Sequence, residues 1–369
     1  MSLNQAAKYF DNAATTPLDP RVREEMLFWM SEGFGNASSI HQWGQRARQA
    51  VEQARESIAE LVDALDPSEI VFNSGATEGN NWVVNSFEKV ITSPFEHSSV
   101  REPAVYHHWP KAHTEGWNLT APTEKYDLLS AMLVNNETGA VINASPWFHL
   151  GPNADTGAKF VHRDLTQAAG KIQLHEHAYD LGTFSGHKLH GPKGIGVVHM
   201  RTMLLDHPAL RGGGQEGGHR GGTLNVPGIV GMGLAAKIAI DEMEAEWHHA
   251  TELRSILKEA VDRIPGSFVV EGEGPGLVQS PYILCACFEG IHGESLVIEL
   301  DNHGFAISSG SACASQSTEP SQVLKPLGLP NELIRGATRL SFSRFNTLDS
   351  AHDLARLLPK VVEQIRSLG

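Results

Sequence analysis

Short apolar runs alternate with longer amphipathic stretches over the first two thirds of the chain. The apolar runs predict β-strands, and the stretches between them, such as 80–87 (NNWVVNSF), predict helices. Strands are expected within residues 69–75, 89–93, 130–139, 159–164, 180–188 and 194–200. Because strands that alternate with helices favour a mostly parallel sheet with helices on both faces, we expect an α/β fold.

The last third of the chain has a different pattern. Apolar residues recur at steps of three and four over residues 228–264, which predicts a long helical stretch. Further strands are expected within 268–274, 282–288 and 338–343, and helices at 292–304 and at the C-terminus. We therefore predict a large domain over 16–250, with a mostly parallel mixed sheet flanked by helices. A smaller α+β domain is expected over 251–369, with residues 1–15 packed against it.

The composition of the chain limits the kinds of binding partner and the cellular location that we expect. The formal net charge of the 369-residue chain is -14, and no basic patch stands out, so tight nucleic-acid binding is not expected. We find no apolar run long enough to span a bilayer and no signal peptide. The chain has three cysteines, an odd number, which favours a reducing cytoplasm over a disulfide framework.

Most candidate functional residues follow a predicted strand directly, and open parallel sheets bind ligands at the carboxyl ends of their strands. Lys188 lies in such a position within 184–196 (FSGHKLHGPKGIG), beside Ser185 and His187. A lysine near hydroxyl and imidazole groups can form a Schiff base with a carbonyl cofactor. The alternative is a surface lysine beside a glycine turn.

A glycine turn also precedes the helix expected after residues 69–75. In 73–81 (NSGATEGNN) the helix begins at about Ala76, where free backbone N–H groups and the helix dipole would hold a phosphate, with a bond from Thr77. Simple capping by Ser74 or Thr77 is the alternative. The spacing of a P-loop is absent.

One acidic residue ends a predicted strand. Asp164, in 162–171 (HRDLTQAAGK), would pair with the ring nitrogen of a pyridine and keep it protonated, which makes the ring an electron sink. Gln167 would face the same way. The alternative for Asp164 is a helix N-cap.

Three further polar residues fit the same kind of ligand. His97 follows the strand at 89–93 and would stack on a flat ring or relay protons. Asn136 would reach a ring hydroxyl, and Arg339 would bind a carboxylate through two hydrogen bonds. The alternatives are a solvent-facing histidine, an asparagine in a turn and a surface ion pair. Together with the lysine, the acid and the phosphate cradle, these residues match what pyridoxal phosphate requires.

The cysteines divide into two kinds. Cys313 lies in 308–317 (SSGSACASQS), whose small residues suit a mobile loop, and a thiolate there would be a nucleophile. The alternative is an incidental exposed thiol. Cys285 and Cys287 would share one face of a strand, and we expect them to pack in the core rather than bind a metal.

The motifs, in their order along the chain, resemble those of the cysteine desulfurases of the NifS/IscS type. These belong to the fold-type-I (class V aminotransferase) group of pyridoxal-phosphate enzymes. The likeness covers nearly the whole chain and is carried by YFDNAATTPLDPRV, FGNASSIHQWG, VFNSGATEGNN, EHSSV, VNNETGAV, DLTQAAGK, FSGHKLHGPKGIG, GGGQEGGHRGGTLNV, SSGSACAS and EPSQVLKPLGL. The lysine stretch and the cysteine segment are the most specific of these.

The resemblance implies a cofactor, pyridoxal 5′-phosphate, and a role for each matching residue. Lys188 would hold the cofactor as a Schiff base and move protons at the substrate α-carbon. Asp164 would pair with the pyridine nitrogen, Gln167 would bond the ring hydroxyl, and His97 would stack on the ring and assist proton transfer. The residues implied for the phosphate are Ala76, Thr77, Ser185 and His187, with Thr223 of a neighbouring subunit, so a homodimer is expected. No metal is implied.

On the substrate side, the resemblance implies that Asn36, Asn136 and Arg339 hold a carboxylate and that Cys313 is the nucleophile. The implied reaction converts L-cysteine to L-alanine and leaves the sulfur as a persulfide on Cys313. A sulfur-acceptor or scaffold protein in iron–sulfur cluster or thiolation pathways would then receive it. The alternatives are a selenocysteine lyase, an aminotransferase, or a catalytically silent scaffold. Leu165 stands where the family usually has alanine, and we expect it near the cofactor ring.

Overall fold

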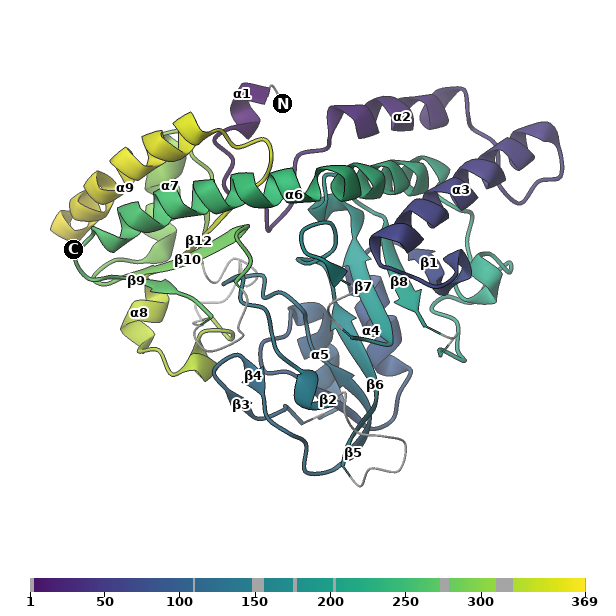
Figure 1. Cartoon of the computed structure of the whole chain (residues 1–369), viewed down its shortest axis with the longest axis horizontal. Coiled ribbons are helices and arrows are strands. Elements are labelled where there is room, and N and C mark those ends of the chain that lie inside the picture. Colours follow the sequence, from purple (N-terminus) through teal and green to yellow (C-terminus); the bar gives the residue numbers. More distant parts are fainter. Residues whose placement is uncertain are drawn as a thin grey trace.

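The larger of the two main sheets is mixed and mostly parallel (Figure 1). The computed structural model describes residues 3–108, 110–147, 156–174, 178–201, 204–272, 279–309 and 321–368. In these residues the sheet has six strands in the order β1-β8-β7-β6-β5-β2. Their bounds are β1 Ile70–Asn73, β2 Val90–Thr92, β5 Lys125–Ser130, β6 Gly157–Asp164, β7 Leu181–Ser185 and β8 Gly196–Met200. Only β8 is antiparallel to its neighbours, so the carboxyl ends of the other five strands meet at one edge.

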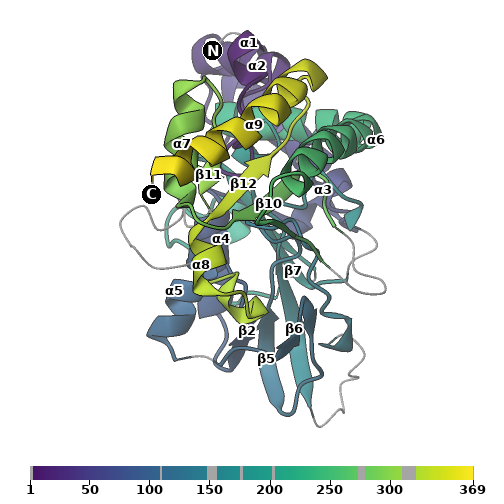
Figure 2. The same ribbon diagram turned by 90° about the vertical axis from the view of Figure 1, so that its left-hand side faces the viewer.

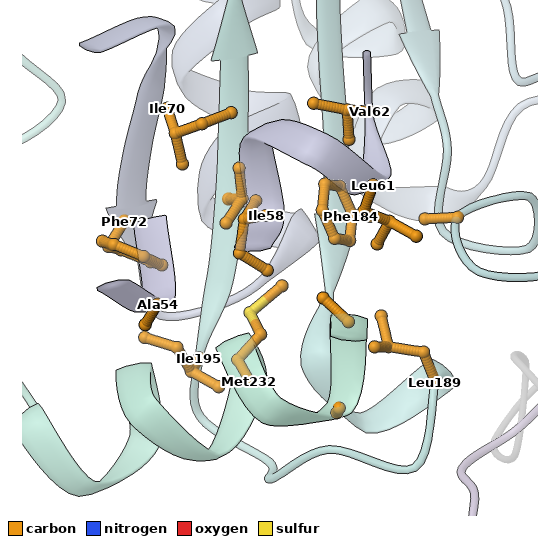
Figure 3. Packing of buried hydrophobic residues seen from close by; sticks show 14 of the residues in the cluster. Ala54, Ile58, Leu61, Val62, Ile70, Phe72, Phe184, Leu189, Ile195 and Met232 are labelled. Carbon is orange, nitrogen blue, oxygen red and sulfur yellow. The ribbon is translucent and has the colours of Figure 1, made fainter. Parts of the chain in front are cut away.

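Helices cover both faces of this sheet, as the sequence pattern predicts. Their bounds are α2 Pro20–Ser31, α3 Gln42–Leu61, α4 Ala76–Asn85, α5 Ser98–Tyr106 and α6 Val226–Asp262. Successive strand residues point to opposite faces. Phe72 therefore packs with Ile58 of α3 and Met232 of α6 (Figure 3), whereas Val71 packs with Val83 of α4.

The second sheet is antiparallel and has the order β11-β12-β10-β9. Its strands are β9 Ser267–Val270, β10 Ile283–Phe288, β11 Ser308–Ser309 and β12 Ala337–Ser341, and its helices are α7 Gly293–Asn302, α8 Asn331–Arg335 and α9 Leu348–Leu368. The short α1, Leu3–Ala6, leads into a segment whose Phe10 belongs to the same core, and α9 packs over this part (Figure 2). A small β3–β4 hairpin, Thr114–Glu115 and Asn118–Leu119, lies apart from both sheets.

One helix joins the two parts. α6 runs unbroken across residue 250 (Figure 1). Its first half packs in the core of the larger sheet and its second half, from Ala250 to Val261, in the core of the smaller one. The domain boundary between 250 and 251 stays a prediction. No helix in the described part is long and apolar enough to cross a membrane.

One strand differs from its prediction. The assigned strand β5 covers Lys125–Ser130, earlier than the strand and loop expected within 130–139. The apolar run after it still follows β6, because the backbone N–H groups of Ala131 and Leu133 donate to the carbonyl oxygens of His162 and Asp164, both at 3.0 Å. The chain turns at Asn135, whose Oδ1 accepts the backbone N–H groups of Glu137 and Thr138, both at 3.0 Å.

Candidate active site

A cavity of about 300 Å³ lies at the edge where the parallel strands end. Most of its lining residues lie at or just after the end of a strand of the larger sheet, where sheets of this kind bind ligands, whereas Arg339 comes from β12 of the smaller sheet. Ten of the residues singled out in the sequence line it: Ala76, Thr77, His97, Asn136, Asp164, Gln167, Ser185, His187, Lys188 and Arg339. Residues up to 263 positions apart in the chain therefore come together as expected.

Lys188 ends a short 3-10 turn, Gly186–Lys188, directly after β7. Its side chain is half-buried, and Nζ donates to the carbonyl oxygens of Ala13 at 2.5 Å and Ala14 at 2.8 Å. Both alanines also line the cavity. The lysine is therefore aimed into the cavity rather than at the outer surface.

Asp164, the last residue of β6, is a buried carboxylate with two hydrogen-bond donors. Its Oδ2 accepts from Asn80 Nδ2 at 2.8 Å, and its Oδ1 accepts the backbone N–H of Thr166 at 2.9 Å. The second bond closes a turn, because residues 166–171 form turns and not a helix, so the helix N-cap alternative does not hold. A buried carboxylate must be compensated in this way to stay ionised.

His97 caps α5 and is connected to Asp164 by hydrogen bonds. Ser99 contacts His97 Nδ1 twice, with its hydroxyl oxygen at 2.9 Å and with its backbone N–H at 3.2 Å. Asn80 Nδ2 in turn donates to Ser99 Oγ at 2.8 Å. Burial lowers the pKa of His97, and the Asp164 charge opposes this effect. The ring is then neutral at neutral pH, and two donors at Nδ1 leave its proton on Nε2.

The start of α4 forms the phosphate-sized end of the cavity. Gly75 has a φ of 151°, a conformation that favours glycine, and no side chain caps the helix. The Ala76 N–H donates to Ser185 Oγ at 2.7 Å, which joins the ends of β1 and β7. Ser74 instead donates to Glu78, so the capping alternative does not hold. Burial, and then the charge of Lys188, lower the pKa of the neighbouring His187 to about 4.

Arg339 and Asn136 close the opposite side. The Arg339 side chain is buried and donates to the backbone carbonyl of Asn136 at 2.9 Å and to Asp11 Oδ1 at 2.8 Å. It is therefore a buried ion pair and not a surface one. Asp11 fixes the guanidinium next to the cavity, where its positive charge attracts an anionic ligand.

Two predicted residues do not line this cavity, and a third lies outside the described residues. Asn36 and Thr223 are both exposed and do not line it, and Asn36 Oδ1 accepts the N–H of Ser38 at 2.9 Å. Cys313 lies outside the described residues. The other two cysteines, Cys285 and Cys287, are buried in the core, as expected, and the described part of the chain holds no cluster of metal ligands.

The cavity also has walls that the sequence did not single out: Ala13, Ala14, Ser99, Met132, Val134 and Thr166. The expectation that Leu165 lies near the ring is wrong. Leu165 packs in the core, where a Cβ added at Gly182 would lie 2.7 Å from its Cδ1. Thr166, the next residue, lines the cavity instead, within the turn that its N–H closes on Asp164 Oδ1.

The residues present fit pyridoxal phosphate. The buried Thr166 Oγ1 has no hydrogen-bond partner within the described chain and lies in the cavity wall near Asp164. Beside it are a buried carboxylate for a ring nitrogen, a lysine amine for a carbonyl carbon and an uncapped helix start for a phosphate. Each polar feature of the cofactor has a matching group.

Comparison with known proteins agrees with this geometry. The family model described as aminotransferase class-V matches residues 8–354. The protein named cysteine desulfurase IscS of Methanosarcina thermophila is 35% identical over 100% of this chain and 95% of its own length. A structure titled NifS-like protein matches with a TM-score of 0.83 and 31% identity, covering 96% of this chain and 99% of that one.

A second structure, titled SspA in complex with cysteine, matches with a TM-score of 0.72 and 29% identity over 92% of this chain and all of that one (100%). The family match and the full-length relatives confirm the resemblance and the fold class predicted from the sequence. The enzymes of this family use pyridoxal phosphate, which the cavity fits. The chain belongs to the class-V aminotransferase family of pyridoxal-phosphate-dependent enzymes.

Proposed function

We propose that the protein is a cysteine desulfurase that converts L-cysteine to L-alanine and carries the sulfur as a persulfide on Cys313. The observation that carries the proposal is that Lys188, Asp164 and Arg339 line one cavity. Lys188 supplies an amine and Asp164 a carboxylate for the cofactor, and Arg339 supplies a cation for the substrate carboxylate. The similarity to proteins named cysteine desulfurase and to a structure with bound cysteine supports this choice.

When bound, pyridoxal phosphate withdraws electrons from the carbon atoms of an attached amino acid. The chain's residues hold and tune it. Asp164 would keep the ring nitrogen protonated, and Gln167 would donate to the ring oxygen. Ala76, Thr77, Ser185 and His187 would bind the phosphate. His97 would stack on the ring and, with its proton on Nε2, assist proton transfer.

The substrate is oriented by its carboxylate. Arg339 and Asn136, which line the cavity, would bind that group and direct the substrate α-carbon towards Lys188. The role of Asn36 in binding the carboxylate stays a prediction, because Asn36 does not line the cavity of one chain. The Lys188 amine then takes a proton from the α-carbon and returns one later in the reaction. Because Arg339 is already fixed by Asp11 at 2.8 Å, little reorganisation is needed when the carboxylate binds.

Cys313 acts on the substrate sulfur. Its thiolate forms an S–S bond with that sulfur while the bond from the sulfur to the substrate β-carbon breaks. The β-carbon keeps the electron pair of the broken bond and gains a proton, which gives alanine. The described residues on either side of residues 310–320 support this role. Ser308 pairs with Arg339, and Ser321 Oγ donates to Glu137 Oε2 at 2.5 Å, beside Asn136.

A homodimer would complete the site. Thr223 is exposed and is free to reach the phosphate of a second subunit. Large apolar side chains are also exposed on α2, on the segment that follows it and at the start of α3: Leu27, Met30, Phe34, Ile40 and Trp43. Apolar exposure of this size is typical of an interface. We expect a cytoplasmic enzyme that hands sulfur to an acceptor or scaffold protein for iron–sulfur clusters or thiolation.

Product analysis tests the function. Purified protein with L-cysteine should give alanine and a persulfide in equal amounts, whereas a selenocysteine lyase would act only on selenocysteine and an aminotransferase would give a keto acid. Cys313→Ser should keep the cofactor absorbance and lose sulfur transfer, with the buried Cys287→Ala as the thiol control. If Cys313→Ser made persulfide and alanine at the wild-type rate, the nucleophile assignment would be wrong.

A further inference from the structure

Lys188 separates two cavities. On one side is the cavity of about 300 Å³ described above, and on the other is a second, of about 10 Å³. The second cavity is lined by ionisable side chains that the proposed reaction does not use: Lys171, His190, Glu246, Tyr282 and Arg344. Of these, Lys171 is connected to the cofactor site by a hydrogen bond.

The turn after Asp164 directs Lys171 inward. Gly170 has a φ of +73°, and a Cβ there would lie 2.9 Å from the Cβ of Ala239 on α6. The turn therefore packs tightly on α6, and the chain changes direction at Gly170. As a result, the Lys171 side chain is buried, and its Nζ lies 5.8 Å from the ring centroid of Tyr282. Burying a lysine is costly and requires a polar partner.

That partner is Gln167. Lys171 Nζ donates to Gln167 Oε1 at 3.1 Å. An ammonium group has no acceptor, so the end of the amide that it contacts must be the oxygen. The NH2 end then lies on the other side, where Nε2 donates to the Ala13 carbonyl at 2.9 Å in the wall of the larger cavity. Lys171 and the Ala13 carbonyl together hold the Gln167 amide with its oxygen towards Lys171 and its NH2 group at the wall of the cavity.

The charges around Lys171 depend on Lys188. Burial, and then the Lys188 charge, lower the pKa of Lys171 to about 7, whereas Glu246 on α6 opposes the shift. The other ionisable groups that face it are Arg339, His187, His190 and Tyr282. Attachment of the cofactor to Lys188 would replace its ammonium group with a nitrogen whose proton is shared with the negative ring oxygen. The smaller net positive charge beside Lys171 would favour the ammonium form of Lys171 and hence its role as a donor.

We infer that Lys171 is a positioning residue for the cofactor, which acts by holding the Gln167 amide with its N–H group towards the oxygen of the pyridine ring. Such a donor stabilises negative charge on the ring oxygen. It thereby favours loss of the proton that this oxygen shares with the nitrogen of Lys188. The inference rests on the proposed roles of Lys188 and Gln167.

The test is an absorbance titration of the resting holoenzyme without substrate. The measured quantity is the pH midpoint at which the absorbance of the lysine-bound cofactor changes. Lys171→Met and Gln167→Met should each raise this midpoint by about one pH unit, because each removes the donor at the ring oxygen. The double variant should shift no further than Gln167→Met alone, because Lys171 acts through Gln167.

Additive shifts in the double variant, or a Lys171→Met midpoint equal to that of the wild type, would overturn the inference. Lys171→Arg is a second variant in case the Met variant does not fold. It keeps a donor, so its midpoint should stay near the wild-type value, and a shift as large as that of Gln167→Met would contradict the inference. Wild-type protein without cofactor absorbance would instead contradict the proposed role of Lys188.

Discussion

Asn80 on α4 donates its side-chain N–H to Asp164 Oδ2 at 2.8 Å, across 84 positions of sequence. The amide of Asn80 is fully used: it also donates to Ser99 Oγ and accepts the hydroxyl of Thr183. One buried side chain thus holds both the carboxylate proposed for the ring nitrogen and the serine that orients His97. The two proposed cofactor contacts are coupled through it.

Asn80→Ala should weaken cofactor binding and lower kcat/KM by about 10- to 100-fold. Removing a partner from a buried charged group costs about 1.5–3 kcal/mol. The measurement is cofactor titration with steady-state kinetics. Asn81→Ala is the matched control, because Asn81 lies next to it on α4 and donates only to the backbone carbonyls of Thr77 and Ser99. Equal losses in the two variants would show that the Asp164 contact has no special effect.

Gly196 at the start of β8 gives a steric prediction. A Cβ at this position would lie 2.5 Å from the Cα of Gly75, directly before the start of α4. Gly196→Ala should therefore displace the phosphate end of the cavity and lower cofactor affinity at least about tenfold, a loss of about 1.4 kcal/mol. Gly272→Ala is the control, since its new Cβ would meet nothing closer than 3.6 Å. Unchanged affinity in Gly196→Ala would contradict the proposed phosphate position.

Glu137 gives a prediction about pH. Burial raises the pKa of Glu137 from 4.5 to about 7, with the Ser321 hydroxyl and the Arg339 charge opposing the rise. The folded protein therefore keeps the Glu137 proton up to about pH 7, whereas the unfolded chain loses it near pH 4.5. The contribution of Glu137 to the stability of the fold is therefore lost as the pH rises between these two values.

Glu137→Gln cannot ionise. Its free energy of unfolding should therefore rise relative to the wild type from pH 5 to pH 8, by at most about 3 kcal/mol. Urea unfolding at the two pH values measures this difference. Glu56→Gln, at an exposed position on α3, is the control. A difference between Glu137→Gln and the wild type that did not change with pH would contradict the burial argument.

The sequence could predict residues that follow a strand. Asp164 and Lys188 end or follow strands whose apolar pattern is clear, and parallel strands end at one edge, so their meeting was predictable. Leu165 and Thr166 were not distinguished, because the turn that follows Asp164 decides which one lines the cavity.

Other parts of the site depend on contacts between distant segments. The bond from Lys188 to Ala13 joins residues 175 positions apart, and no local pattern indicates it. No role follows from the sequence for either Asn80 or Lys171, and only the structure reveals their burial and their polar partners. Asn36 and Thr223 do not line the cavity of one chain, and their proposed roles stay predictions.

Reduction of the holoenzyme with borohydride, followed by peptide mass spectrometry, tests the central claim most directly. Borohydride fixes a cofactor that is bound to an amine. The account predicts a pyridoxyl phosphate group on the peptide that contains Lys188 and on no other, and none in Lys188→Ala, which should also be colourless and inactive. A cofactor found on a different lysine, such as Lys171, or an unmodified Lys188 peptide from coloured wild-type protein, would contradict it.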